Sequence, residues 1–473
     1  MFAFVCFLSF FLKTSLCLDC NPSSVIVALG NYYEIMYAIP ENERNLDEKY
    51  LFTITYQSND YCGDSYIKLL YAGLELQIQR DSFDDMKTTQ NGALTVLNIF
   101  RVKKKQISLL GVKLKYSIYP VAISPIKFDY SFLLPTQNHE IKHSFIFVGQ
   151  LDNDNDASSL TINAISTRLK TEDIDGVLYV GNTNKTSNEN YAEFEKYMLS
   201  KMEPITSLAA YHPTPNYIDW KDPMEFYKTR FLFDNAGKVE EDFLAFSIGF
   251  MDVIQLNIMK YILDPTLKVR FMDYLTKQYK DVTFESNYSK WAVLYTYYPL
   301  YCSFDECKFL LENYNTGLKE LEKIIYGSEF DLVISGKLPI YERTHPIYNY
   351  NKDSQVKNNF NLTSSWYPIY IIEGVGGNSD NAIKNTKISN NYDVLTNYEA
   401  GYGKLIVENR TCMHYIHYSS KSNEIIDEFY VFKVSYRWSD EERNEFLTVT
   451  ILYVFFGIAL IVLFQFYVES KMI

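Results

Sequence analysis

The sequence predicts a small antiparallel β-sandwich followed by a larger α/β layered domain, with one apolar segment near each end of the chain. Three observations carry this prediction: closely spaced β segments between residues 24 and 133, alternating strand-like and helix-like runs after Pro135, and two apolar runs without charges. The chain has 473 residues, 47% of them hydrophobic, so it has enough apolar side chains for two or three folded units.

The first apolar run, Phe2 to Leu12, is 11 residues long. It is too short to cross a bilayer, but it suits the core of a signal peptide, and Ser15 to Cys17 offer small residues for cleavage. We therefore expect a signal peptide over residues 1–17, which implies an extracellular or lumenal location for the rest.

The C-terminal run, Phe446 to Val468, has 23 residues without a charge. At about 1.5 Å per residue, a helix of this length exceeds a hydrocarbon core of about 30 Å. We expect a transmembrane helix over 446–468 and a cytosolic tail over 469–473, which makes the chain a single-pass type I membrane protein. A removable GPI signal is the alternative, although the charged stretch SDEERNE before the run is a poor cleavage site.

Charge and cysteine usage limit the function classes. The net charge is −13 and no basic stripe is present, which excludes a nucleic-acid-binding protein. The sequence contains no CxxC pair, so a structural zinc site is not indicated. The spacing allows a Cys302–Cys307 disulfide, and Cys20 could pair with Cys62, which would leave Cys412 over. Sequons for N-glycosylation begin at Asn184, Asn287, Asn361 and Asn409.

The first β segments are SVIVALG, LFTITYQ, IKLLYAG, ALTVLNIF and VKLKYSIYPVAI, and their short spacing is typical of a sandwich. After Pro135 come the strand-like run HSFIFVG, a polar stretch, the strand-like run DGVLYVG and the amphipathic run NYAEFEKYMLSKM. Further strands are expected at MDVIQLN, WAVLYTYYPL, FDLVISG and YPIYIIEG, a helix over Glu306 to Ile325, and a closing β hairpin-like tail.

Glycines follow four of the α/β strand-like runs, at Gly149, Gly181, Gly336 and Gly374. Ligands of such folds bind at the carboxyl ends of the strands. The residues that carry a family resemblance stand at these ends, in five blocks: FIFVGQLD (145–152), GVLYVGNTNK (176–185), TPNY (214–217), WAVLYTYYPLYCS (291–303) and FDLVISGKLPIYERTHPIYN (330–349). The later segments PIYIIEGVGGNSD, GYGKLIVENRT and IIDEFYVFK continue the match.

In these blocks the chain resembles the purple acid phosphatases, over about residues 24–435. The resemblance implies an N-terminal fibronectin-III-like β-sandwich over 18–135 and an α/β metallophosphatase-like four-layer sandwich over 140–438. The family holds a pair of metals, such as Fe and Zn, with seven ligands supplied by the five blocks.

The resemblance also places the ligand positions, and six of the seven carry a different residue. Only Asn216 keeps the family's residue type, and Tyr217 stands at the position of the catalytic His. Amide, ammonium and proline side chains cannot replace carboxylate and imidazole ligands, so we expect no bound metal pair. The seven positions are Gln150, Asn182, Lys185, Asn216, Tyr297, Lys337 and Pro339.

Residues at or near these positions allow two other functions. His212, Asp152 and Asp154 could form a single weak metal site, but the more ordinary interpretation is that they are solvated loop residues. Lys185 and Lys337 could supply positive charge to a small anion, unless both simply face solvent. A glycan on Asn184 would stand at the rim of the site.

The leading hypothesis is therefore a membrane-anchored, catalytically inactive purple-acid-phosphatase-like protein that binds an unknown protein or a small anionic ligand. No cofactor is expected in that case. The alternative is an acid phosphatase that hydrolyses phosphate monoesters at an atypical metal site.

Overall fold

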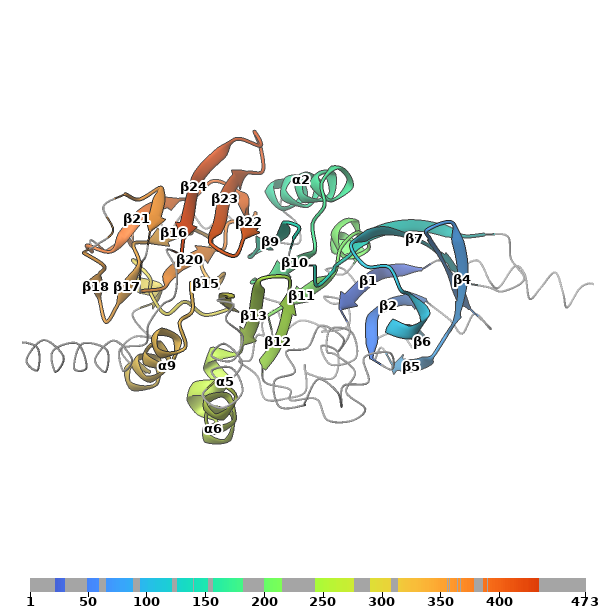
Figure 1. Ribbon diagram of the computed structural model, residues 1–473, viewed down its shortest axis with the longest axis horizontal. Coiled ribbons are helices and arrows are strands. Elements are labelled where there is room, and N and C mark those ends of the chain that lie inside the picture. The colour runs from blue at the N-terminus through green and yellow to red at the C-terminus, as the bar shows by residue number, and fades with distance from the viewer. Residues whose placement is uncertain are drawn as a thin grey trace, which may run out of the picture. The chain divides into compact units, whose positions relative to one another are not determined.

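The computed structural model (Figure 1) describes residues 22–433 apart from 30–48, 59–64, 88–93, 121–125, 139, 152–155, 182–199, 215–242, 276–289, 308–313, 355, 357, 364, 366, 378–385 and 389. The chain up to Phe432 forms one compact unit. Within the described residues no helix is long and apolar enough to cross a membrane. The apolar runs at 2–12 and 446–468, and the Cys20–Cys62 pair, lie outside the described residues.

The N-terminal part forms two four-stranded antiparallel sheets. Side chains of one face of each sheet meet in a common core, where the rings of Phe52 and Phe132 lie 5.1 Å apart. The first sheet has the order β1 (Ser23–Leu29), β2 (Tyr50–Ser58), β6 (Leu94–Lys103) and β5 (Ser82–Lys87). The second has the order β4 (Leu74–Gln79), β3 (Tyr66–Tyr71), β7 (Val112–Tyr119) and β8 (Phe128–Leu134), and a short 3-10 helix, η4, spans Lys104–Gln106.

The following part contains two mixed seven-stranded sheets. Buried parallel strands are continuous apolar runs, which is why the strand-like runs of the sequence fall on them. The first sheet has the order β11 (Tyr211–Pro213), β10 (Gly176–Tyr179), β9 (His143–Val148), β22 (Gly401–Asn409), β23 (Cys412–Ser419), β24 (Ile425–Phe432) and β19 (Asn361–Thr363). The second has the order β12 (Phe243–Ile248), β13 (Met251–Leu256), β14 (Trp291–Thr296), β15 (Leu332–Ser335), β20 (Ile369–Glu373), β16 (Tyr341–Thr344) and β21 (Asp393–Asn397).

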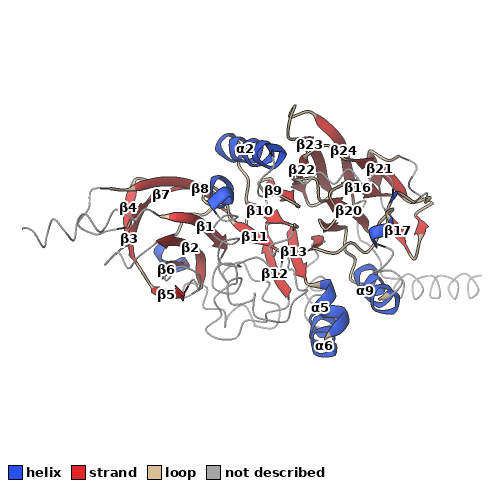
Figure 2. Ribbon diagram, turned by 180° about the vertical axis from the view of Figure 1, so that it is seen from behind, coloured by secondary structure: helices blue, strands red, loops and turns tan. Residues whose placement is uncertain are grey.

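The two sheets pack face to face and helices cover their outer faces (Figures 1 and 2). Helix α2 (Asp156–Thr171) packs on the first sheet, and α5 (Ile258–Leu263), α6 (Pro265–Asp273) and α9 (Asn315–Gly327) pack on the second. The helices and the two sheets therefore make four layers. A small hairpin of β17 (Ile347–Tyr348) and β18 (Asn351–Lys352) lies outside both sheets.

One helix was not expected from the sequence. The polar stretch after the strand-like run HSFIFVG is helix α2, because Ile162, Ile165 and Leu169 share one face and are buried against the sheet. The helix expected over Glu306 to Ile325 lies partly outside the described residues: Glu306 and Cys307 are helical, residues 308–313 are not described, and α9 follows at Asn315. Cys302 is bonded to Cys307 just before the undescribed residues.

The first strand of the sandwich contacts the edge of the first seven-stranded sheet. Val27 forms a parallel bridge with Ala210, next to β11. The Thr206 hydroxyl donates to the Val25 carbonyl at 2.6 Å, and the Tyr116 hydroxyl donates to the Ser207 carbonyl at 2.8 Å. These bonds join the sandwich to the α/β layers within one continuous core.

Candidate functional site

Four glycines that follow parallel strands lie at one edge of the two sheets, which we call the strand-tip edge: Gly149, Gly181, Gly336 and Gly374. Backbones from both sheets approach closely there. A Cβ atom on Gly149 would lie 2.7 Å from the Glu373 carbonyl oxygen, and one on Gly374 would lie 1.6 Å from the Leu338 carbonyl oxygen. Only glycine fits at such positions, so the sequence's glycines allow the strand ends to converge.

Three of the predicted ligand positions meet at the strand-tip edge. The Gln150 amide donates to the Lys337 carbonyl at 2.5 Å and reaches the Tyr297 hydroxyl at 3.4 Å. The Lys337 backbone N–H in turn donates to the Tyr297 carbonyl at 3.0 Å. Gln150 adopts a left-handed conformation, with φ of 49°, so its backbone makes a tight turn after β9.

The side chains around Gln150 are held by packing as well. The Lys337 ammonium lies 4.6 Å from the centre of the Tyr298 ring, and burial lowers the pKa of Lys337. Burial raises the pKa of the Tyr297 phenol, which keeps it protonated at neutral pH. Pro339 is half-buried, and its neighbour Leu338 packs in a cluster with the disulfide.

These residues do not fit the family's pair of metals. A neutral amide, a protonated phenol and an ammonium group lack the negative charge and free lone pairs that such ions require. Across the part of the chain that the structure describes, no group of three His, Cys, Asp or Glu could hold a metal ion. The positions Asn182, Lys185, Asn216 and Tyr217, together with Asp152, Asp154 and the sequons at Asn184 and Asn287, lie outside the described residues.

His212 is not the solvated loop residue that the sequence suggested. It lies in β11 and is 1% exposed. Its Nε2 atom accepts the Leu29 backbone N–H at 3.2 Å, and its ring lies 5.6 Å from that of Phe246. Because the lone pair of Nε2 is used by the sandwich strand β1, this imidazole serves packing between the two parts of the chain.

A buried polar cluster lies directly beneath the strand-tip edge, and sequence reasoning missed it. Glu373 is the last residue of β20, and both it and His417 of β23 are fully buried. The Glu373 carboxylate lies 2.9 Å from Nδ1 of His417 and accepts the Tyr415 hydroxyl at 2.6 Å. The Tyr341 ring stacks on His417 with centroids 3.9 Å apart. This cluster joins the two sheets because its members come from both of them.

A buried ion pair extends the cluster. Arg343 of β16 donates to the Asp427 carboxylate of β24 from Nε at 2.6 Å and from Nη2 at 2.9 Å. The Tyr341 hydroxyl also donates to Asp427, at 2.7 Å. The sequence signal was present in the Tyr-Glu-Arg of the fifth block and in the segment IIDEFYVFK, but only the packed sheets bring the two segments together.

Glu342, between these two β16 residues, lies on the opposite side of the strand from Tyr341 and Arg343. The Ser303 hydroxyl donates to its carboxylate at 2.6 Å, and the Ser303 N–H at 3.3 Å. Burial raises the pKa of Glu342 to about 7 in spite of these donors. Ser303 follows Cys302, so the carboxylate is held against the disulfide loop.

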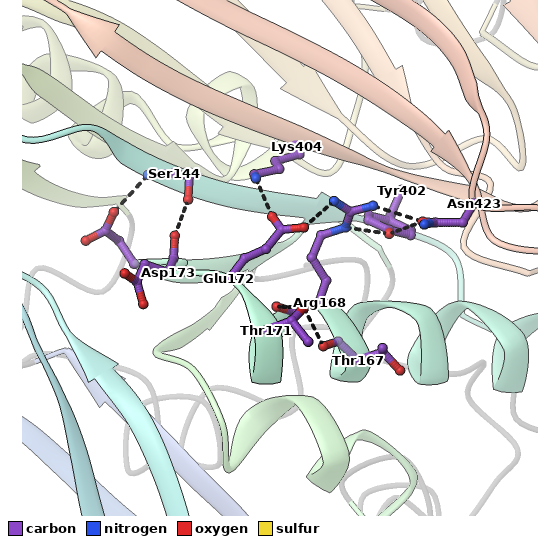
Figure 3. A network of polar contacts seen from close by, with 10 residues as sticks. Ser144, Thr167, Arg168, Thr171, Glu172, Asp173, Tyr402, Lys404 and Asn423 are labelled. Carbon is purple, nitrogen blue, oxygen red and sulfur yellow. Dashed lines mark hydrogen bonds and ion pairs between the residues drawn. The ribbon is translucent and has the colours of Figure 1, made fainter.

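Helix α2 is fixed to β22 and to the turn between β23 and β24 by a second polar network, drawn in Figure 3. Arg168 donates to the Tyr402 hydroxyl at 2.9 Å, to Glu172 at 2.6 Å and to the Asn423 side chain at 2.9 Å. Lys404 of β22 also contacts Glu172, at 2.5 Å (Figure 3). The network sets α2 on the outer face of the first sheet.

Comparisons with known proteins agree with this architecture. A family model described as iron/zinc purple acid phosphatase-like protein C matches residues 367–428. Acid phosphatase type 7 of Homo sapiens is 24% identical over 273 residues, which are 54% of this chain and 60% of that protein. The Danio rerio protein of the same name is 22% identical over 289 residues, 57% of this chain and 63% of that protein. The chain thus spans about three-fifths of the length of these curated relatives.

Among solved structures, a purple acid phosphatase from yellow lupin (Lupinus luteus) seeds superposes with a TM-score of 0.67 at 14% identity, over 87% of this chain and 74% of that chain. At this identity the likeness concerns the fold alone. The matched C-terminal domain, the two curated relatives and the superposed fold point the same way. The resemblance is therefore confirmed: this chain has a purple acid phosphatase-like fold and carries a purple acid phosphatase-like C-terminal domain.

Proposed function

We propose that this chain is a purple acid phosphatase-like protein that does not hydrolyse phosphate esters and that acts as a binding or surface module. One observation carries the proposal: the Gln150 amide occupies the strand-tip edge and bonds to Lys337 and Tyr297, at positions where the family has metal ligands. The Gln150 amide is hydrogen-bonded to the Lys337 backbone carbonyl, and the Lys337 ammonium group lies over the Tyr298 ring.

The chemistry of hydrolysis supports the same proposal. Family members polarise the phosphate ester and generate the attacking hydroxide with two metal ions. Neither Gln150 nor Lys337 supplies a charge that attracts such ions, and the raised pKa of Tyr297 keeps its oxygen from acting as an anionic ligand. Among the described residues, the two partners of the Gln150 amide are a protonated phenol and a backbone carbonyl, and neither acts as a general base.

Turnover of p-nitrophenyl phosphate between pH 4 and 8, with Fe, Zn or Mn added, tests the proposal. We expect the wild type and Gln150→Ala to give the same background rate of hydrolysis. An inactive protein contributes nothing to this rate, which then comes from contaminants in both preparations. A metal-dependent rate that exceeds the Gln150→Ala rate would support the alternative, an acid phosphatase with an atypical metal site. The sequence similarity to two proteins named acid phosphatase type 7 favours this alternative.

A small anion is a candidate ligand at the strand-tip edge. Lys337 is half-buried there beside the Gln150 amide, and Lys185 belongs to the same set of sequence positions. If this is the function, phosphate raises the melting temperature of the wild type and not of Lys337→Met. Equal shifts in both proteins, or none, exclude anion binding at Lys337.

We also propose that the module is anchored in a membrane by residues 446–468, after removal of the signal peptide 1–17, with the folded part extracellular or lumenal. The length of the apolar run and the exposure of the sequon residues Asn361 and Asn409 support this location. We expect the protein to stay in the membrane fraction after extraction with alkaline carbonate and after treatment with phosphatidylinositol-specific phospholipase C. Release by the phospholipase would show a GPI anchor instead.

We further propose that the N-terminal sandwich is fibronectin-III-like, supported by its two antiparallel sheets.

A further inference from the structure

The outer face of the first seven-stranded sheet has one row of residues that leads to its free edge. Ile406, His414 and Tyr430 face one another across β22, β23 and β24, and Asn361 of β19 is paired with Tyr430. Residues directly opposite in a ladder project from the same face. In β24 the alternate residues Phe429 and Val431 are buried, which places Tyr430 on the outer face.

This end of the sheet is aromatic. The rings of His414 and Tyr430 stack with centroids 4.0 Å apart, and those of Tyr430 and Phe432 lie 6.1 Å apart. Phe360, just before β19, is 63% exposed, and its carbonyl accepts the Tyr430 N–H at 2.7 Å. We call Phe360, Tyr430 and Phe432 the edge patch.

Strand β19 is the last in the order of its sheet. Among the strands that the structure describes, none is paired with β19 on the side away from β24. An uncovered strand edge beside an exposed aromatic ring invites pairing with another chain, and stable proteins cover or block such edges. The exposed Asn361 sits on this edge, in the same row as Tyr430, and it begins the sequon Asn-Leu-Thr.

The backbone before Asn361 is fixed by a side chain. Oδ1 of Asn358 accepts the N–H of Phe360 at 2.7 Å and that of Asn361 at 3.2 Å. The backbone of Phe360 and of the acceptor Asn361 is therefore fixed at the start of β19. A sugar linked to Asn361 would begin beside Tyr430, which is opposite Asn361 in the ladder, and next along the chain to the exposed Phe360.

We propose that Asn361 carries an N-linked glycan whose first N-acetylglucosamine packs on the edge patch and covers the free edge of β19. The apolar C–H face of a sugar ring is complementary to an aromatic face, and the outer sugars would keep a second chain from adding to the edge. The inference rests on the proposed extracellular or lumenal location, because N-glycans are added only there.

Full-length protein expressed through a secretory pathway tests the proposal. Mass spectrometry measures occupancy at Asn361 and at Asn409, the exposed sequon in the turn between β22 and β23. The wild type and the Asn409→Gln variant are then treated with one of two enzymes. Endoglycosidase H leaves one sugar on the asparagine, and peptide-N-glycosidase F leaves none. Melting temperature and self-association are recorded for each product.

We expect occupancy at Asn361, an unchanged melting temperature after endoglycosidase H, and a lower melting temperature with more self-association after complete removal. Asn361→Gln should reproduce the loss and Asn409→Gln should not. In Phe360→Ser, the two enzyme products should differ less, because one of the rings that the sugar contacts is gone.

The other outcomes separate this inference from the proposed location. Occupancy at Asn409 with none at Asn361 overturns the glycan and leaves the location standing. Absence of glycan at these two sites and at the sequons of Asn184 and Asn287 overturns the glycan and the location together. Occupancy at Asn361 without any effect of complete removal overturns the covering role.

Discussion

Residues 337–343 contain two kinds of position that lie only a few residues apart. Lys337 and Pro339 stand at the strand-tip edge, where the resemblance places metal ligands, and both depart from the family's residue types. Tyr341 and Arg343 match the family pattern and are 0% and 1% exposed between the two sheets. The difference teaches that packing between the sheets restricts side chains independently of the chemistry at the tip, so the fold can persist while the site changes.

The largest expected effect comes from breaking the packed half of this segment. Arg343→Leu leaves the Asp427 carboxylate buried without its cation, so we expect a loss of about 3–5 kcal/mol in the free energy of unfolding. Arg101→Leu removes a matched but partly exposed ion pair with Asp81 and should cost about 1 kcal/mol or less. Urea denaturation measures both. Equal losses would show that Arg343 is not a structural anchor.

The pH dependence of stability sharpens the comparison at Glu342. Its pKa in the folded protein is about 7, above the ordinary value of 4.5. Between these pH values the folded protein holds a proton on Glu342 that the unfolded chain releases. The contribution of Glu342 to stability is therefore fully present below pH 4.5 and is lost as the pH rises through 7. The full change amounts to about 3 kcal/mol.

Glu342→Gln is the matched control, because it keeps the shape of the side chain and cannot titrate. Denaturation at a series of pH values should show a flatter profile for this variant between pH 4.5 and 7.5. An unchanged slope would assign the dependence to other groups.

We expect adding a side chain at a glycine of the strand-tip edge to destabilise the protein more than changing an existing side chain there. A Cβ atom on Gly374 would meet the Leu338 carbonyl oxygen, whereas one on Gly327 would have no heavy atom within 4 Å. We therefore expect Gly374→Ala to destabilise by about 1–3 kcal/mol. Gly327→Ala, at the end of helix α9, should be neutral or slightly stabilising. Thermal denaturation of the two variants gives the comparison directly.

The smallest effect is expected at the tip itself. Gln150→Gly removes the side-chain hydrogen bonds to Lys337 and Tyr297, but it also relieves the left-handed backbone at this position. The two contributions oppose each other, so we expect a change within about 1 kcal/mol. A much larger loss would mean that the Gln150 amide is itself a structural anchor of the fold.

Much of the fold could be predicted from the sequence, because β9, β10, β13, β14, β15 and β20 are short runs rich in apolar residues, as buried strands are. Helix α2 was missed because its apolar face is narrow, with serine, threonine and asparagine between Ile162, Ile165 and Leu169.

The candidate site could be predicted in part. The strand-end glycines followed from the strand pattern, because parallel strands end at one edge. The grouping of Gln150, Tyr297 and Lys337 was what the family resemblance implied, and the structure brings these three residues together. The Glu373–His417 pair could not, because its members come from different sheets and meet only through packing. The use of His212 by β1 likewise depends on a contact between two parts of the chain.

The central claim is that the strand-tip edge no longer holds the family's metals. Elemental analysis of the purified full-length protein, after incubation with excess Fe and Zn and removal of free ions, tests it most directly. We predict far less than one metal ion per chain, with the same content in Gln150→Ala. Two tightly held metal ions per chain, lost in Gln150→Ala, would contradict the account.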